Sequence, residues 1–181
     1  MIEIRIHGRG GQGGVTSAEL LARAAIDKGK FAQAFPSFGP ERRGAPVVAF
    51  VRVDDSKIRV REKIYSPDYV MVLDPTLLDI VDVAEGLKDG GTIIVNSHAT
   101  AAELKDKYGW PKAAQVDANT VAMEELGVPI TNTTMLGALL KATDILPVED
   151  METVINDRFG GKLGPKNYSA LGRAYKETEL A

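Results

Sequence analysis

A run of glycines near the N-terminus is the feature that most narrows the folds open to this chain of 181 residues. Residues 2–6 alternate apolar and charged side chains, as a strand does, and GRGGQGG follows at residues 8–14. Residues 15–28 then place small and apolar side chains on one helical face. The order strand, glycine loop, helix predicts the opening unit of an α/β fold. A capping box of Thr16 and Glu19 leaves open whether the helix begins inside the glycine run or just after it.

The rest of the chain continues to alternate strand-like and helix-like segments. We expect strands at Phe31–Phe35, Val47–Val53, Lys57–Val60, Tyr69–Leu73, Thr92–Val95 and Ala113–Val116. We expect helices at Thr76–Leu87, Asn119–Leu126, Thr131–Thr143, Glu149–Phe159 and Pro165–Thr178. The pattern predicts one domain over residues 1–181, a three-layer α/β/α Rossmann-like fold with a mostly parallel sheet. An antiparallel hairpin, turning at Asp54-Asp55-Ser56, should lie at the sheet edge.

Composition excludes several kinds of chemistry. The chain has no cysteine, so it cannot supply thiolate nucleophiles or the thiolate ligands of zinc and iron-sulfur sites. Its only histidines, His7 and His98, are too few for a histidine-rich metal site. No apolar run approaches the roughly 20 residues of a membrane helix, and no export signal precedes the first strand. We therefore expect a cytoplasmic protein with no membrane partner.

Charge is distributed unevenly along the chain. Residues 1–63 carry 12 Lys and Arg against 7 Asp and Glu, whereas residues 64–161 carry 6 against 16. The basic excess near the glycine run favours an anionic ligand or partner there, although an uneven solvated surface accounts for it equally well. The net charge of −3 argues against nucleic-acid binding.

The glycine run itself matches the G-x-G-x-x-G spacing of dinucleotide-binding loops. Backbone amides at a helix N-terminus favour phosphate or carboxylate, so the candidate anion-binding residues are Gly8, Gly10, Gly11, Gln12, Gly13 and Gly14. A tight turn that only packs the helix on the sheet is the alternative. A dinucleotide site also needs an acidic residue at the end of the second strand, and none stands beside Phe35. A P-loop is excluded because no Lys-Ser or Lys-Thr follows the glycines.

Two further groups of residues are candidates for binding. The loop PSFGPERRGAP carries Glu41, Arg42 and Arg43, and guanidinium groups suit carboxylates, phosphates or partner surfaces. This loop should leave the second strand at the same sheet edge as the glycine run. Asn96 follows a buried strand, where open α/β sheets bind ligands, or it caps the next helix. The chain offers no convincing catalytic or metal-binding constellation, so no catalytic residue is assigned.

Four motifs in order carry a resemblance to a known family. HGRGGQGGVTSAELLARAA, PSFGPERRGAPVVAFVRVDD, SPDYVMVLDPTLL and NTTMLGALLKAT with DRFGGKL resemble the gamma subunit of pyruvate:ferredoxin oxidoreductase and of related 2-oxoacid:ferredoxin oxidoreductases. The resemblance covers nearly the whole chain. It implies a subunit of an enzyme that oxidatively decarboxylates a 2-oxoacid with coenzyme A to acyl-CoA, carbon dioxide and reduced ferredoxin.

The resemblance also implies a division of labour. Thiamine diphosphate and [4Fe-4S] clusters would lie in the alpha, beta and delta partner subunits, with ferredoxin as electron acceptor and no cofactor held tightly by this chain. The glycine loop would meet an anionic part of coenzyme A, with Glu41, Arg42 and Arg43 toward the active centre or the subunit interface. The ERRGAP form is closer to pyruvate or branched-chain enzymes than to 2-oxoglutarate enzymes. A stand-alone NAD(P)- or FAD-binding Rossmann oxidoreductase is the alternative hypothesis.

Overall fold

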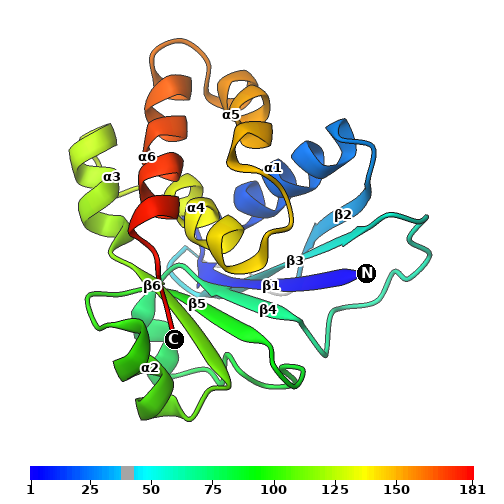
Figure 1. Ribbon diagram of the computed structural model, residues 1–181, viewed down its shortest axis with the longest axis vertical. Coiled ribbons are helices and arrows are strands. Elements are labelled where there is room, and N and C mark those ends of the chain that lie inside the picture. The colour runs from blue at the N-terminus through cyan, green and yellow to red at the C-terminus, as the bar shows by residue number, and fades with distance from the viewer. Residues whose placement is uncertain (38–42) are drawn as a thin grey trace.

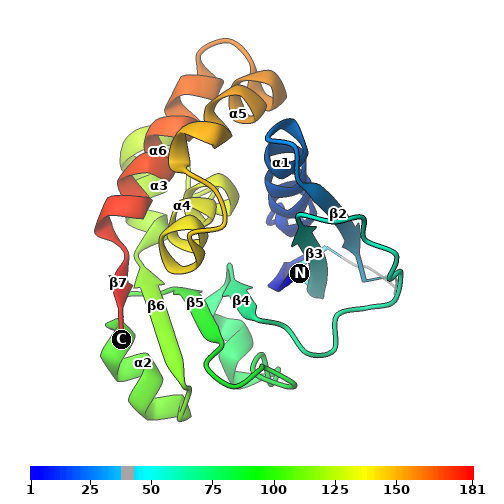
Figure 2. The same cartoon turned by 45° about the vertical axis from the view of Figure 1, so that its right-hand side comes forward.

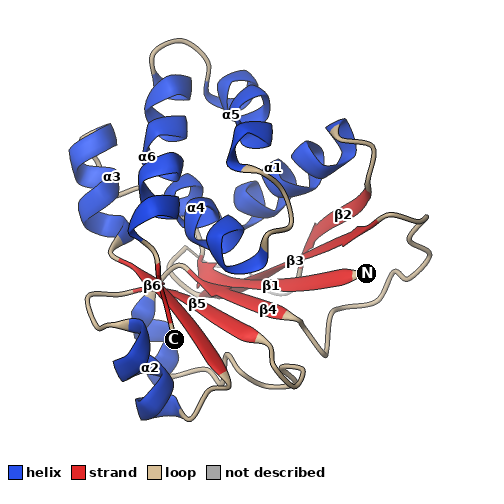
Figure 3. Cartoon of the chain, viewed as in Figure 1, coloured by secondary structure: helices blue, strands red, loops and turns tan. Residues whose placement is uncertain are grey.

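The computed structural model describes residues 1–37 and 43–181, which build a seven-stranded sheet with helices on both faces (Figures 1 and 3). The strands are β1 (Ile2–Arg9), β2 (Phe31–Pro36), β3 (Pro46–Asp54), β4 (Tyr69–Val72), β5 (Thr92–Asn96), β6 (Lys112–Val116) and β7 (Glu179–Leu180). The α-helices are α1 (Gly14–Asp27), α2 (Ala101–Tyr108), α3 (Ala118–Leu126), α4 (Asn132–Thr143), α5 (Glu152–Phe159) and α6 (Leu163–Glu177). Two short 3-10 helices are η1 (Pro75–Asp79) and η2 (Val148–Met151).

The strands lie in the order β2-β3-β1-β4-β5-β6-β7. Strands β1, β4, β5 and β6 are parallel, whereas β3 runs antiparallel to both β1 and β2, and β7 runs antiparallel to β6. The predicted α/β class, with a mostly parallel sheet and an antiparallel pair at its edge, is therefore confirmed. Because β1 and β2 run in the same direction, the loops that leave them emerge at the same edge of the sheet.

The two faces of the sheet are covered unequally. Helices α1, α3, α4, α5 and α6 lie on one face, and α2 lies on the other, beside β6 (Figure 2). The larger core packs Ile4 and Ile6 of β1 against the five helices, and a smaller core around Val72 and Trp110 lies beneath α2. The third layer of the predicted sandwich is thus thin. No helix in the described ranges has the length and apolar character needed to cross a bilayer.

The predicted strand Lys57–Val60 is wrong. Strand β3 already pairs with β1 along one edge and with β2 along the other, so no edge remains for the residues that follow it. The antiparallel hairpin at the sheet edge is formed instead by β2 and β3, joined through the proline-containing loop. Residues 57–60 continue as unpaired chain toward β4.

The predicted helix Thr76–Leu87 is also wrong. Only η1 forms there, and the carboxylate of Asp82 then accepts the amide of Ala84 at 3.0 Å, a local turn that competes with helical bonding. The sequence analysis missed α2, although its N-terminus carries a clear signal. Thr100 and Glu103 form a reciprocal capping box around the first turn of this helix.

Candidate functional site

The glycine loop joins the end of β1 to the start of α1 at the edge where the parallel strands end. Gly11 and Gly13 adopt left-handed φ values of 94° and 79°, which favour glycine. The helix begins at Gly14, inside the glycine run, with Gly13 as its N-cap. A β-carbon on Gly13 would lie 2.6 Å from Nδ2 of Asn132, at the start of α4. Gly13 therefore meets both a conformational and a steric requirement.

The first turn of α1 leaves backbone donors free. Ser17 donates its amide to the carbonyl of Gly13 at 2.9 Å, and the amides of residues 14–16 have no acceptor among the described atoms. The predicted capping box of Thr16 and Glu19 does not form, because the helix already begins at Gly14 and its N-cap is Gly13, which has no side chain, rather than Thr16. No acidic side chain occupies this turn. The positive end of the helix dipole is therefore not neutralised by the helix itself.

A hollow of about 320 Å³ borders these amides. It is lined by the glycine loop, by the first turn of α1, and by Val47 and Ala49 of β3. The predicted residues Gly8, Gly10, Gly11, Gly13 and Gly14 all border it. Free amides, an uncompensated helix dipole and close backbone approach together suit an anionic group such as a phosphate.

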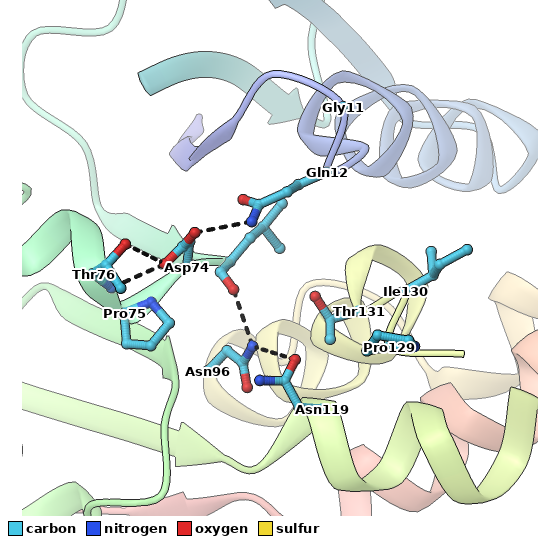
Figure 4. A pocket seen from close by; sticks show the side chains of 11 residues that line it. Gly11, Gln12, Asp74, Pro75, Thr76, Asn96, Asn119, Pro129, Ile130 and Thr131 are labelled. Carbon is cyan, nitrogen blue, oxygen red and sulfur yellow. Dashed lines mark hydrogen bonds between the residues drawn. The ribbon is translucent and has the colours of Figure 1, made fainter. Parts of the chain in front are cut away.

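The side chain of Gln12 points away from this hollow and fixes the loop. Its Oε1 accepts the amide of Arg9 at 2.7 Å, and its Nε2 donates to Oδ2 of Asp74 at 2.9 Å (Figure 4). The Nε of Arg9 lies 3.0 Å from the same carboxylate oxygen. Asp74 lies two residues after the end of β4, so this network ties the glycine loop to the neighbouring parallel strand.

Asp74 is ionised within this network. Partial burial disfavours the charged carboxylate, but hydrogen bonds from Thr76 and Gln12 and the charge of Arg9 outweigh it and hold the pKa of Asp74 below its usual value. The sequence analysis missed Asp74. Its signal was present, since a carboxylate that immediately follows a buried parallel strand lies at the ligand-binding edge of the sheet.

The proline-containing loop returns to the glycine loop, as its position predicted. Gly10 donates its amide to the carbonyl of Ala45 at 2.9 Å, and Gly44 donates to the carbonyl of Gly10 at 3.1 Å. The predicted residue Arg43 is exposed and directly precedes this contact. Glu41 and Arg42 lie outside the described residues.

Asn96 has a structural position at the end of β5. It is only 2% exposed, its Nδ2 donates to the carbonyl of Leu73 at 3.0 Å and to Oδ1 of Asn119 at 3.3 Å, and its Oδ1 accepts the amide of Ala118 at 3.0 Å. These bonds join β4, β5 and the start of α3. The next helix, α2, is capped by Thr100 instead.

A second hollow of about 390 Å³ lies between Asn96 and the glycine loop (Figure 4). It is lined by residues that follow the parallel strands and by the segment before α4: Gly11, Gln12, Leu73, Asp74, Pro75, Thr76, Asn96, Asn119, Pro129, Ile130 and Thr131. The two hollows share Gly11. Asn96 and the predicted glycine loop are therefore brought to one edge of the sheet.

The start of α4 adds a second helix N-terminus beside Gly13. Its first turn has no acidic residue, and Ser17 of α1 donates its hydroxyl to the carbonyl of Asn132 at 3.2 Å. Asn132, Thr133 and Thr134 are buried, and each leaves a side-chain oxygen without a partner among the described atoms. The sequence analysis placed these three residues only at the start of the predicted helix Thr131–Thr143.

Neither histidine has the position of an acid-base catalyst. Burial, with a smaller contribution from Arg5, lowers the pKa of His7 to about 3, so the ring is neutral near pH 7. Nε of Arg5 donates to Nε2 of His7 at 3.1 Å. His98 is exposed, with its Nδ1 3.0 Å from Asp117. Within residues 1–37 and 43–181, no group of three or more His, Cys, Asp and Glu side chains could hold a metal ion.

The topology also disfavours the dinucleotide alternative. In the dinucleotide-binding fold, the strand after the first helix lies beside β1 and brings an acidic residue to the ribose. Here β1 lies between β3 and β4, and β2 is separated from it by β3. Strand β2 ends at Pro36 and is followed by Ser37, so no carboxylate stands directly after it.

Comparisons with known proteins agree on one family. A sequence profile described as pyruvate ferredoxin/flavodoxin oxidoreductase matches residues 3–177. The chain is 57% identical, over 98% of its length and 97% of the relative's, to the pyruvate/ketoisovalerate oxidoreductases common subunit gamma of Thermococcus litoralis. It is 51% identical to the pyruvate synthase subunit PorC of Methanothermobacter thermautotrophicus, over 99% of this chain and 97% of that one.

A solved structure agrees with these relatives. The crystal structure of the pyruvate oxidoreductase subunit PORC of Thermotoga maritima superposes with a TM-score of 0.89 at 39% identity. The match covers 99% of this chain and 98% of that one.

Proposed function

The chain belongs to the pyruvate ferredoxin/flavodoxin oxidoreductase family as a gamma-type subunit, and from this we propose that it supplies part of the coenzyme A site of a 2-oxoacid:ferredoxin oxidoreductase. The enzyme would convert a 2-oxoacid and coenzyme A to acyl-CoA, carbon dioxide and reduced ferredoxin. Pyruvate or a branched-chain 2-oxoacid is the proposed substrate. The names of the relatives, which refer to pyruvate and ketoisovalerate, support this choice.

The observation that carries the coenzyme A proposal is the free N-terminus of α1. Coenzyme A carries phosphate groups, and the amides of residues 14–16 are unbonded donors at the positive end of a 14-residue helix. The residues assigned to the contact are Gly8, Gly10, Gly11, Gly13, Gly14 and Arg43. Gln12 and Asn96 serve as positioning residues, because their polar groups bond within the protein. Glu41 and Arg42 remain proposed contacts.

The partners follow from the same proposal. The alpha, beta and delta subunits would hold thiamine diphosphate and the [4Fe-4S] clusters, which remove the carboxylate and carry electrons to ferredoxin. The absence of cysteine in this chain supports that placement of the clusters. One profile match over residues 3–177 supports a single domain over residues 1–181. The cytoplasm is the proposed compartment.

The first experiment tests assembly. The tagged chain is co-expressed with candidate alpha, beta and delta subunits, and the purified complex is assayed with pyruvate, coenzyme A and ferredoxin. A complex that contains all subunits and is active only with coenzyme A supports the proposal. Failure of the chain to copurify with any of these subunits would contradict it.

The second experiment tests the site. Arg43→Ala in the assembled enzyme should raise the KM for coenzyme A by about tenfold or more, since a charge-assisted hydrogen bond contributes roughly 1.5–3 kcal/mol. Arg158→Ala is the matched control, because Arg158 is an exposed arginine on α5. Equal KM values for the two variants, with assembly intact, would remove Arg43 from the site.

A further inference from the structure

The segment between β3 and β4 has an unusual backbone. From Lys57 to Tyr65, no amide donates a hydrogen bond to any atom in the part of the chain that the structure describes. Neither helix nor strand is assigned to these residues, which form an open stretch of chain beside β2 and β3 (Figure 1). Nine consecutive free amides are a long run for a folded protein, whose backbone donors mostly pair within secondary structure.

The sequence of this segment is nevertheless that of a strand. Lys57, Arg59, Arg61 and Lys63 alternate with Ile58, Val60 and Glu62, so an extended conformation would place the four cations on one face. All four are exposed, and none forms an ion pair with another described residue. The protein as a whole carries a net charge of −3, so this row of four cations has the opposite sign to the net charge of the chain.

The structure holds the segment in place at its far end. Ile64 is only 3% exposed, and Arg52 of β3, itself 1% exposed, donates from Nη2 to the carbonyl of Lys63 at 3.4 Å. The near end is fixed by β3. The free amides therefore belong to a segment tethered at both ends rather than to a loose tail.

A hollow lies beside the segment, at the edge of the sheet. Gln33, Ala34 and Phe35 of edge strand β2 line it together with Arg61, and its volume is about 350 Å³. Oε1 of Gln33 and the nearby Nη1 of Arg52 are buried without a partner among the described residues. Both atoms are covered by this chain itself, so the space open to a neighbouring chain is the hollow between edge strand β2 and Arg61.

We propose that residues 57–63 form a β-strand by pairing with an extended, acidic segment of another subunit of the oxidoreductase, an inference that rests on the proposed role within a multi-subunit enzyme. The free amides of residues 57–63 donate the backbone hydrogen bonds between this strand and the partner segment, as in peptide recognition by strand addition. The four cations select a partner rich in Asp and Glu. A second copy of this chain fits poorly, because two such rows of cations would face each other.

Hydrogen exchange measured by mass spectrometry tests the pairing directly. In the isolated chain, the amides of peptides spanning residues 57–63 should exchange rapidly; in the assembled complex, about half of them should become protected, because alternate amides of a strand face the same neighbour. Rapid exchange in both states, in a complex shown to be assembled and active, overturns the strand while leaving the proposed function standing. Failure to assemble contradicts the proposed function instead.

Two pairs of variants separate backbone from charge. Val60→Pro removes a backbone amide that donates to no atom of this chain, and Val60→Thr, which keeps the amide, is its control. Only the proline variant should bind the partner subunits more weakly, by up to about tenfold for one lost hydrogen bond. Arg59→Glu/Arg61→Glu should weaken binding by at least tenfold, on the order expected for reversing two interface charges. Lys162→Glu/Lys166→Glu, exposed on another face, should not.

The other occupants predict different results. Binding to nucleic acid would be lost with the charge reversal but not with Val60→Pro, and it would appear as retention on a DNA column. Self-pairing would appear as a concentration-dependent dimer in sedimentation of the isolated chain. Either result, or wild-type binding by both Val60→Pro and Arg59→Glu/Arg61→Glu, overturns the proposed pairing.

Discussion

Substituting Gly13 by alanine should destabilise the chain more than the same change at Gly11. Both glycines have left-handed φ values, so an alanine at either position costs roughly 1–2 kcal/mol. At Gly11 the new β-carbon meets no atom within 4 Å. At Gly13 it lies 2.6 Å from Nδ2 and 3.1 Å from Cβ of Asn132, a residue only 5% exposed that can yield only by moving the start of α4.

Overpacking of this kind adds about 1–3 kcal/mol, so Gly13→Ala should lower the free energy of unfolding by roughly 2–5 kcal/mol in total. Urea denaturation of the isolated variants, followed by far-UV circular dichroism, measures both values. Domains of this size are stable by about 5–15 kcal/mol, so a folded Gly13→Ala variant is expected. Equal losses for the two variants would show that the approach of α1 to α4 at Gly13 does not constrain this residue.

Other substitutions test the rest of the site and its support. Asp74→Asn should lower stability more at pH 7 than at pH 3: the pKa of Asp74 is lowered in the folded chain, so its stabilisation is fully present well above its unfolded pKa of about 4 and decreases as the pH falls through the folded pKa. Urea titrations of variant and wild type at both pH values check this, and an equal difference at the two would contradict it. Gly137→Ala should cost about 1–3 kcal/mol, because a β-carbon there would collide with the carbonyl of Leu171 and separate α4 from α6. Gly172→Ala, in the same pair of helices but with no atom within 4 Å of the new β-carbon, should instead raise the free energy of unfolding by up to about 1 kcal/mol. The melting temperature should rise with it.

Local patterns were sufficient to predict the fold class. The apolar runs YVMVL and TIIV are buried between two cores, as continuous runs in parallel strands usually are, and the strand-glycine-helix opening forms as its pattern indicates. The secondary-structure predictions were wrong where contacts with other strands, rather than the pattern of the segment itself, decide its structure. Residues 57–60 have a strand pattern, yet β3 has no free edge to offer them.

The site was predictable in part. The strand-glycine-helix order was enough to predict free amides at a helix N-terminus, and the nearness of this loop to Arg43 followed from strand direction. Asp74 was missed although its place after a buried parallel strand was a usable signal. Asn132 was missed because its role lies in its close approach to Gly13, a contact across the chain that no local spacing encodes. Gln12 and Asn96 both line the second hollow, and their bonding partners became clear only from the folded geometry.

The central claim is that the first turn of α1 binds an anionic part of coenzyme A within the assembled oxidoreductase. Hydrogen exchange of the amides of residues 13–16, measured in the purified complex with and without saturating coenzyme A, tests it most directly. The account predicts slower exchange of these amides when coenzyme A is present, and no change at the first turn of α2, which has its own capping box. Unchanged exchange at residues 13–16, in a complex that turns over coenzyme A, would contradict it.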